Sequence, residues 1–219
     1  MDYSVEDREV VVPGQKLGVS GKCDLTCFKD HDEIYSLVHG LVRQGGDHVT
    51  VIPSKGAYMP KEGDVVIGVV KSVRETFWIV DIGSPYSSYI LKDEVVKTRG
   101  SVDLKQFFDV GDVISGKVSS LNEVYSHLII RPWKLEVGLI IKVNPKRIPR
   151  VIGKSRSMLE VIKSKTGSRI IVGQNGLIWL KGGKADLGVK AIRKIEAQAQ
   201  TRGLTERITN FLDSESKEV

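Results

Sequence analysis

Short apolar runs with interspersed polar positions dominate residues 1–133, and this pattern predicts strands rather than helices. Within residues 1–59 the runs are EVVVPG, EIYSLVHGLV and HVTVIP, and they are interrupted at Pro13-Gly14, Gly45-Gly46 and Pro53. Glycine and proline commonly separate strands, and none of these runs has the period of a long helix. We expect residues 1–59 to form a small all-β domain.

Residues 60–133 show the same pattern more strongly. Five β-rich segments follow one another along the chain: GDVVIGVVKSV, FWIVDIG, SSYILKDEV, GDVISGKVSSL and SHLIIRP. Five short strands at this spacing are typical of a small closed barrel. We expect an OB-fold barrel over residues 60–133.

The pattern changes after Pro132. The run GLIIKV (138–143) predicts a strand, and residues 145–152 predict a short helical turn. Ser157 and, three residues later, Glu160 have the form of a capping box at the start of a helix. That helix is expected from apolar residues at helical spacing, followed by a glycine that can end it: Met158, Leu159, Ile162 and Gly167.

Two further strands and a helix complete this region. SRIIVG and LIWLKG predict strands joined through Gln174-Asn175. A last helix should stop near Gly203, and its apolar face consists of Ala191, Ile192, Ile195 and Ala199. We expect an α+β domain over residues 134–212 and a disordered tail over residues 213–219 (DSESKEV). The fold class is therefore multidomain and mainly β, with a C-terminal α+β domain.

Composition adds little until charge is considered, because the net charge of +6 is unevenly distributed. Residues 138–183 carry ten Lys or Arg and one acid, Glu160, so they have a net charge of +9 and the remainder about −3. Such concentration is typical of a surface that binds a polyanion, and the alternative is a solvated basic face without a partner. The ten cations are Lys142, Lys146, Arg147, Arg150, Lys154, Arg156, Lys163, Lys165, Arg169 and Lys181.

Several classes of function are disfavoured. No apolar run approaches the roughly 20 residues of a membrane helix, and the N-terminus is acidic where a secretory signal would be basic. We expect a cytoplasmic protein that contacts no membrane and keeps Cys23 and Cys27 reduced. These cysteines with His31 lack the second ligand pair of a zinc site. No carboxylate pair or nucleophile–histidine series has informative spacing, so we expect no active site and no cofactor.

Two glycine-opened loops lie in the basic segment, at residues 153–156 (GKSR) and 173–176 (GQNG). The first opens a predicted helix and carries cations, which favours a phosphate ligand. The second lacks charge, and glycine with asparagine is favoured in tight turns that need positive φ. We therefore interpret the loop at 153–156 as the ligand candidate and assign a structural role to Gly173, Asn175 and Gly176.

The order strand, helix, loop, helix, strand, strand, helix resembles a K-homology (KH) domain of type I, the eukaryotic-type topology. VIGKSRSMLEVIKSKTG matches its motif, with the four loop positions filled by Gly153, Lys154, Ser155 and Arg156. The resemblance implies that this loop clamps the backbone of about four single-stranded nucleotides. The family has glycine in the fourth position. Arg156 is costly there if the position needs a positive φ, and otherwise it adds a phosphate-binding guanidinium.

The preceding barrel resembles a ribosomal-protein S1-type RNA-binding domain, an OB fold, through PKEGDVVIGVVKSV, FWIVDIG and FDVGDVISGKV. Such barrels combine cations with aromatic rings on which bases stack. Phe77 and Trp78 are adjacent in a strand, so at most one of them can stack on a base from a given face.

Nearly the whole chain resembles the RNA-binding cap subunit of the archaeal exosome, through VVVPGQKL, IPSKGAYMPKEGDVVIGVV, WIVDIGSPYSSYIL and GQNGLIWLKG. The resemblance implies a non-catalytic protein, with three copies on a hexameric ring that degrades RNA from its 3′ end by phosphorolysis. Residues 1–59 would dock on the ring. The RNA-binding candidates are Lys146, Arg147, Arg150, Gly153, Lys154, Ser155, Arg156, Lys71, Arg74, Tyr86, Tyr89 and Arg131.

Two other functions remain open at this point. One is an enzyme that degrades RNA itself, although bacterial polynucleotide phosphorylase carries KH and S1-type domains in the reverse order and on large catalytic domains. The other is a transcription or translation factor of the elongation-factor type, whose S1-type barrel precedes a pair of KH domains of the other topology.

Overall fold

The computed structural model divides the chain into two compact units, Met1–Gly56 and Ala57–Val219. The boundary falls three residues before the predicted one, because Tyr58 is buried in the core of the barrel that follows. The structure describes residues 2–24, 26–54, 58–96, 102–121, 126–199 and 203–217.

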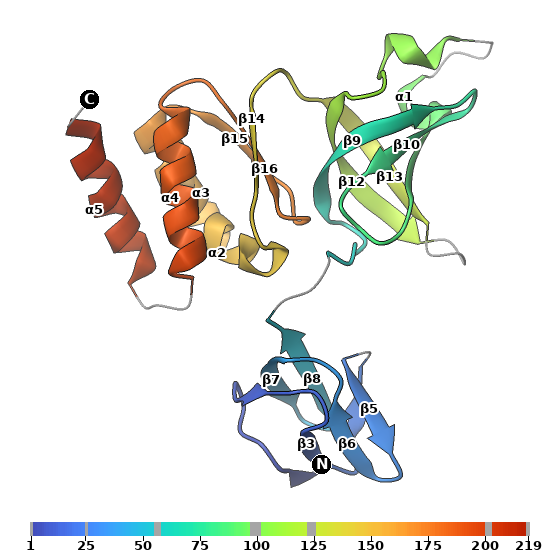
Figure 1. The fold of residues 1–219 in the computed structure, drawn as a ribbon, viewed down its shortest axis with the longest axis vertical. Coiled ribbons are helices and arrows are strands. Elements are labelled where there is room, and N and C mark those ends of the chain that lie inside the picture. Colours follow the sequence, from blue (N-terminus) through green and yellow to red (C-terminus); the bar gives the residue numbers. More distant parts are fainter. Residues whose placement is uncertain are drawn as a thin grey trace. The chain divides into compact units, whose positions relative to one another are not determined.

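The first unit is all-β, and its strands form two four-stranded sheets (Figure 1). One sheet has the order β1-β3-β6-β5, with β1 at Asp2–Tyr3, β3 at Lys16–Val19, β6 at Glu33–Ser36 and β5 at Cys27–Asp30. The other has the order β2-β7-β8-β4, with β2 at Val10–Val11, β7 at Gly40–Gly45, β8 at His48–Pro53 and β4 at Lys22–Cys23. The core of the unit contains Val11, Leu17, Cys27, Ile34, Val42, Val49 and Val51.

The second unit begins with a closed five-stranded barrel, which confirms the predicted OB-type architecture (Figure 1). Its order is β10-β11-β13-β12-β9, with β9 at Val65–Val73, β10 at Phe77–Asp81, β11 at Ser88–Leu91, β12 at Val113–Leu121 and β13 at His127–Lys134. The described residues between β11 and β12 include α1 at Lys92–Val95 and the 3-10 turn Leu104–Gln106. Alternation directs Trp78 into the core, where its indole N–H donates to the Phe108 carbonyl at 2.9 Å.

The predicted order of KH elements is also confirmed. Its antiparallel sheet has the order β14-β16-β15, with β14 at Leu139–Lys142, β16 at Leu177–Lys181 and β15 at Arg169–Val172. Between β14 and β15 lie the 3-10 turn Pro145–Arg147, α2 at Ile148–Ile152, the turn Lys154–Arg156 and α3 at Ser157–Thr166. After the sheet come α4 at Ala185–Ala197 and α5 at Leu204–Lys217.

Strand β16 of the KH sheet is buried on both faces, whereas Leu139 and Ile140 of β14 are exposed. Ile170, Ile178 and Leu180 point into the core formed with the helices, which lie on one side of the sheet (Figure 1). Trp179 points the other way and packs in a small cluster with Ile67 of the barrel and Leu135. Two-faced burial explains why the strand sequences SRIIVG and LIWLKG are nearly continuous in apolar residues.

Helix α5 corrects the expectation of a disordered tail from residue 213. The helix predicted to stop near Gly203 is α4, which ends at Ala197, and α5 follows Gly203 as a further helix that the sequence did not predict. Leu204, Ile208 and Leu212 are buried at i, i+4 and i+8, so one apolar stripe anchors the whole helix on α3 and α4. Its last turns carry the acids of two ion pairs, Lys165–Asp213 at 2.5 Å and Lys190–Glu215 at 2.9 Å. The acidic composition of the tail reflects this pairing.

The predicted capping box is also wrong. Ser157 has helical φ and ψ of −56° and −43°, and the residue at the N-cap is Arg156, which makes no side-chain capping bond. Glu160 lies 3.9 Å from Lys163, one turn further along the helix. The spacing of a capping box was present, but the chain enters the helix through left-handed residues that the spacing does not reveal.

His127 provides a test of barrel packing. It is 1% exposed, and its Nδ1 has no hydrogen-bond partner among the described residues. Burial lowers the pKa of its imidazole below the ordinary value of 6.5, against an opposing hydrogen bond to the Ser87 backbone. The unfolded chain therefore binds more protons below pH 6.5, so the stability present above that pH is lost as the pH falls toward the folded pKa.

We expect the free energy of unfolding, measured by urea denaturation, to fall as the pH is lowered through the ordinary histidine range. His127→Phe should remove most of this slope, whereas the exposed His48→Phe should retain it. An unchanged slope in His127→Phe would show that the pKa of this imidazole is the same in the folded and the unfolded chain.

Candidate nucleic-acid interface

The loop Gly153–Arg156 joins α2 to α3 through an unusual backbone. Gly153 has φ of +75°, and a Cβ there would lie 2.6 Å from the Met158 nitrogen, so the position excludes other residues. Ser155 and Arg156 also have positive φ, at 52° and 66°. Three of the four loop residues thus lie on the side of φ that favours glycine.

Arg156 takes the conformation for which the sequence family uses glycine. A left-handed conformation costs about 1–2 kcal/mol for a residue with a side chain. The fourth loop position thus needs a positive φ, and arginine is strained there. The guanidinium is nevertheless exposed at the mouth of the loop, next to the first turn of α3.

The ten cations of the basic segment fall into two groups. Four of them have a carboxylate within 4 Å: Lys163, Lys165, Arg169 and Lys181. Glu136 serves two of these, and its hydrogen bond from Lys181 holds the pKa of its carboxyl below the usual range. Among the described residues no carboxylate lies within 4 Å of the other six, Lys142, Lys146, Arg147, Arg150, Lys154 and Arg156. Five of these six lie between Lys146 and Arg156, so the positive charge free to meet a ligand is concentrated at α2 and the loop.

The barrel candidates are divided between the two ends of the barrel. At one end, Arg74 and Phe77 line a hollow of about 990 Å³ together with Lys105. The Phe77 ring packs edge-on against Tyr89, with centroids 5.5 Å apart. Phe77 and Tyr89 are half-buried on the outer face of the sheet, where their rings can still meet a ligand.

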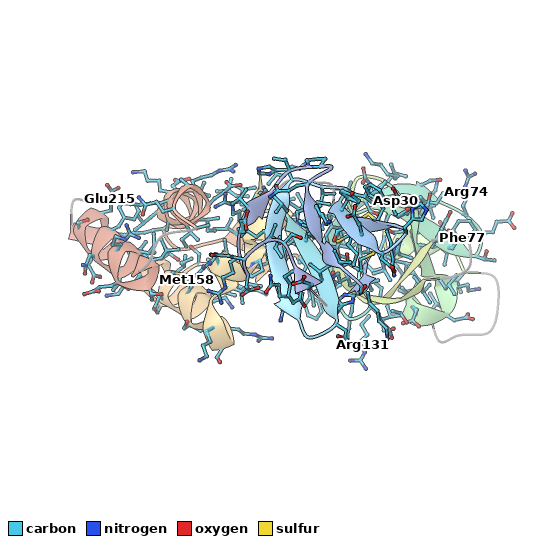
Figure 2. The ribbon with its side chains drawn as sticks, turned by 90° about the horizontal axis from the view of Figure 1, so that it is seen from below. Asp30, Arg74, Phe77, Arg131, Met158 and Glu215 are labelled. Atoms are coloured by element: carbon cyan, nitrogen blue, oxygen red, sulfur yellow. The ribbon has the colours of Figure 1, made fainter. Side chains whose placement is uncertain are left out.

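The other barrel candidates lie elsewhere. Tyr86 packs against His127, with ring centroids 5.9 Å apart, near the opposite end of strand β11. Lys71 is exposed and lies 3.5 Å from the Asp81 carboxylate, so part of its charge is compensated. Figure 2 shows Arg131 apart from Arg74 and Phe77. The structure therefore brings Arg74 and Tyr89 together but not Arg131 or Tyr86 with them.

The second loop, 173–176, joins the KH sheet to the barrel. Asn175 is 4% exposed; its Nδ2 donates to the carbonyls of Ile67 at 2.6 Å and Ile82 at 2.8 Å, and its Oδ1 accepts from the Ile67 nitrogen at 3.2 Å. The Gln174 nitrogen adds a bond to the Val65 carbonyl at 2.8 Å. This set of contacts, which we call the Asn175 clasp, connects a KH turn to strands of the barrel.

Both glycines of that loop are required by the clasp. Gly176 has φ of +88°, and a Cβ there would lie 2.3 Å from the Val143 carbonyl oxygen. A Cβ on Gly173 would lie 2.3 Å from Asn175 Oδ1 and would displace the amide that holds the barrel.

Some surface features were not identified from the sequence as binding candidates. The sequence offered Phe77 as a stacking residue but not among the RNA-binding candidates. Lys105, which is distant from Phe77 in the sequence, lines the same hollow. Trp133 is 66% exposed although it belongs to a barrel strand. No sequence signal marks Lys105, whereas the alternation with buried Trp78 could have placed Phe77 on the outer face.

The described residues contain no group of three or more His, Cys, Asp or Glu placed to hold a metal ion. Among the helices of the described chain, none is long and apolar enough to cross a bilayer.

Comparison with known proteins places two family models on the second unit. A model of the KH domain matches residues 138–186, and a model described as "RRP4, S1 domain" matches residues 57–120. The S1 model ends before β13 of the barrel, and the KH model ends at the start of α4, so each covers most of one domain seen in the structure.

Curated relatives match over nearly the whole chain. The exosome complex component Rrp4 of Picrophilus torridus is 40% identical over 95% of this chain and 94% of its own length. The protein of the same name from Pyrococcus furiosus is 42% identical over 98% of this chain and 86% of its own length. A crystal structure described as that of a candidate exosome complex RNA-binding protein is 34% identical and aligns with a TM-score of 0.67, covering 74% of this chain and 99% of that one.

The clasp predicts that removal of the Asn175 amide strongly lowers the stability of the second unit. Asn175→Ala should lower the free energy of unfolding of the second unit by about 3 kcal/mol, because it leaves three buried backbone groups without partners. Asn210→Ala, an exposed helical asparagine, serves as the control and should change stability little. Urea denaturation measures both, and equal stability of the two variants would contradict the role of the clasp.

The strain at Arg156 predicts that a substitution there stabilises the protein, in contrast to Asn175→Ala. Arg156→Gly should raise the free energy of unfolding by up to about 1 kcal/mol, because glycine adopts φ of 66° without steric cost. Arg156→Ala removes the same charge but keeps the strain, so it should not stabilise the protein. If thermal denaturation shows no difference between the two variants, the left-handed conformation is not held in solution.

Proposed function

Because the chain belongs to the family of the exosome complex component Rrp4, we propose that it is a non-catalytic RNA-binding subunit of an exosome. In this role it caps a phosphorolytic ring, recruits single-stranded RNA and guides the 3′ end into the pore. The observation that supports it best is the cluster of cations beside the KH loop that have no carboxylate within 4 Å in the described part of the chain, in the same unit as an OB-type barrel.

The KH loop suits a phosphate backbone in two ways. The first N–H groups of α3 lack partners within the helix, and they lie at the positive end of its dipole. Arg150, Lys154 and Arg156 are exposed around that helix terminus. Backbone contacts of this kind bind RNA with little dependence on base sequence.

The barrel suits bases rather than phosphates. The half-buried rings of Phe77 and Tyr89 lie on its outer face, and Arg74 and Lys105 line the adjacent hollow. Stacking on aromatic side chains contributes about 1–3 kcal/mol per base and accepts any base. We assign this end of the barrel, rather than Tyr86 or Arg131, to RNA.

The first unit suits docking. Val10, Leu41 and Ile52 are direct cross-strand neighbours on β2, β7 and β8, and they are 57%, 36% and 45% exposed. We call these three residues the apolar stripe. An exposed apolar surface on so small a unit favours a protein partner, which we propose is the hexameric ribonuclease ring, with three copies of this chain per complex.

The same proposal assigns catalysis to the ring and not to this chain. The single KH domain with α2 and α3 between β14 and β15 differs from the paired KH domains of the elongation-factor type. A cytoplasmic location stays a prediction from the sequence.

RNA binding should depend steeply on salt. For single strands the logarithm of affinity falls with the logarithm of salt concentration, with a slope of about −0.7 per phosphate contacted. Arg150→Ala and Lys154→Ala should each weaken binding and make the slope shallower by about one contact. Lys165→Ala, in the same segment but paired with Asp213, is the control and should retain the slope. A salt-independent affinity, or tighter binding to a duplex, in fluorescence anisotropy would contradict the assignment.

Docking can be tested without disturbing RNA binding. Leu41→Asp places a charge in the apolar stripe and should prevent co-elution with the ring in size-exclusion chromatography, while RNA affinity stays at the wild-type level. Val110→Asp, at a 60% exposed apolar residue of the second unit, is the matched control and should still assemble. Full assembly of Leu41→Asp would show that the ring does not contact the stripe.

A further inference from the structure

A small pocket lies where the barrel meets the KH domain within the second unit. Its volume is about 150 Å³. Tyr58, Met59 and Lys61 line it from the barrel side, and Lys146, Pro149 and Gln174 line it from the KH side. We call it the seam pocket.

Gln174, one of the lining residues, has an unused hydrogen-bond acceptor. Its side-chain Oε1 is buried and has no hydrogen-bond partner among the described residues. Buried polar atoms are almost always paired, and an unpaired one costs about 1–3 kcal/mol. A ligand that donates an N–H to this oxygen would recover that cost.

The backbone around Gln174 is held in place. Its nitrogen donates to the Val65 carbonyl, and the next residue is Asn175, whose amide bonds to Ile67 of β9 and to Ile82, the residue after β10. The acceptor is therefore positioned before any ligand arrives, which reduces the entropy lost on binding.

The walls and rim of the pocket have different chemistry. Tyr58 is 6% exposed, and its hydroxyl donates to Asp64 at 2.7 Å, so its ring offers an apolar surface beside Met59 and Pro149. Lys61 and Lys146 are exposed at the rim, and in the described part of the chain no carboxylate lies within 4 Å of either ammonium group. The Asp64 carboxylate also lines the pocket, and it accepts from the Tyr58 hydroxyl and the Lys61 backbone nitrogen. A slot with apolar walls, one unpartnered buried acceptor and a cationic rim matches the parts of a nucleotide.

We propose that the seam pocket binds one nucleobase of the RNA strand that the KH loop holds. A cavity of about 150 Å³ accommodates a single aromatic ring. The base would donate an N–H to Gln174 Oε1, and its phosphates would lie near Lys61 and Lys146. This inference rests on the proposed RNA-binding function and adds a site between the KH loop and the barrel.

The cations between the KH loop and the seam pocket support this site for a base of the RNA. Pro149 of the pocket belongs to α2, and α2 ends at the loop Gly153–Arg156. Arg150 lies on this short helix and Arg147 directly precedes it. Cations with no carboxylate within 4 Å among the described residues therefore continue from the loop to the pocket. A backbone that follows these charges passes the seam pocket on its way to the barrel.

The test combines one substitution with a direct probe of the amide. Fluorescence anisotropy compares the RNA affinity of the wild type with that of Gln174→Met. The probes are labelled single-stranded oligoadenylate and oligouridylate of about 12 nucleotides, which is long enough to span an OB fold and its neighbour. Met keeps the length of the side chain and removes the acceptor. We expect binding to weaken about fivefold, the loss of one hydrogen bond of about 1 kcal/mol. Gln198→Met, at another partly buried glutamine in the KH domain, is the control and should bind as the wild type does.

Nuclear magnetic resonance of the unmodified chain gives a result that does not depend on the folding of a variant. The side-chain NH₂ signal of Gln174 should shift on addition of the same RNA, and that of Gln198 should not. If RNA binds with wild-type affinity to Gln174→Met and the Gln174 signal stays unmoved, the seam pocket is not a nucleobase site and the proposed function stands. A shift of the Gln174 signal on addition of an apolar peptide, but not on addition of RNA, would assign the pocket to a protein partner instead. Absence of RNA binding by the unmodified chain would contradict the proposed function, and this inference with it.

Discussion

The buried amide of Asn175 is the interaction on which the second unit depends. One side chain bonds to the carbonyls of Ile67 and Ile82 and to the Ile67 nitrogen, so a KH turn completes the hydrogen bonding of β9 and of the residue that follows β10. Hydrogen bonds in a site without water are costly to leave unmade, which makes the contact specific as well as stabilising. The cluster of Trp179, Ile67 and Leu135 surrounds the same seam with apolar contacts. Barrel and KH domain therefore present their surfaces to RNA in a fixed relation.

Among the described residues, the paired and the unpaired cations of the basic segment lie on different parts of the KH domain. The basic segment has a formal excess of +9, but Glu136, Glu160 and Asp213 neutralise four of its cations at the sheet and at α5. Ion pairs at exposed positions contribute little to stability, yet they remove positive charge from surfaces where it would attract RNA. What remains is concentrated at α2 and the loop after it. Uniform positive charge would bind RNA everywhere, whereas this arrangement favours one path.

The sequence predicted the parts of the fold that local patterns determine. Strand alternation gave the barrel and the KH order, and the glycines with Asn175 marked a turn with special geometry. It did not predict α5, because polar residues separate the buried Leu204, Ile208 and Leu212, and the acids that follow Leu212 resemble a solvated tail. It wrongly assigned a capping box to Ser157, because the left-handed φ of Arg156 depends on the close approach of Gly153 to Met158. The barrel candidates could not be sorted either, since closure of the barrel decides which end each side chain reaches, and Tyr86 and Tyr89 are only three residues apart.

The central claim is that this chain handles RNA for a separate catalytic ring. The most direct measurement follows a labelled single-stranded RNA with phosphate present, using the ring alone, this chain alone and the two together. The account predicts no loss of RNA with the chain alone and faster shortening from the 3′ end when the chain is added to the ring. Phosphate-dependent degradation by the purified chain, or a ring whose rate the chain leaves unchanged, would contradict it.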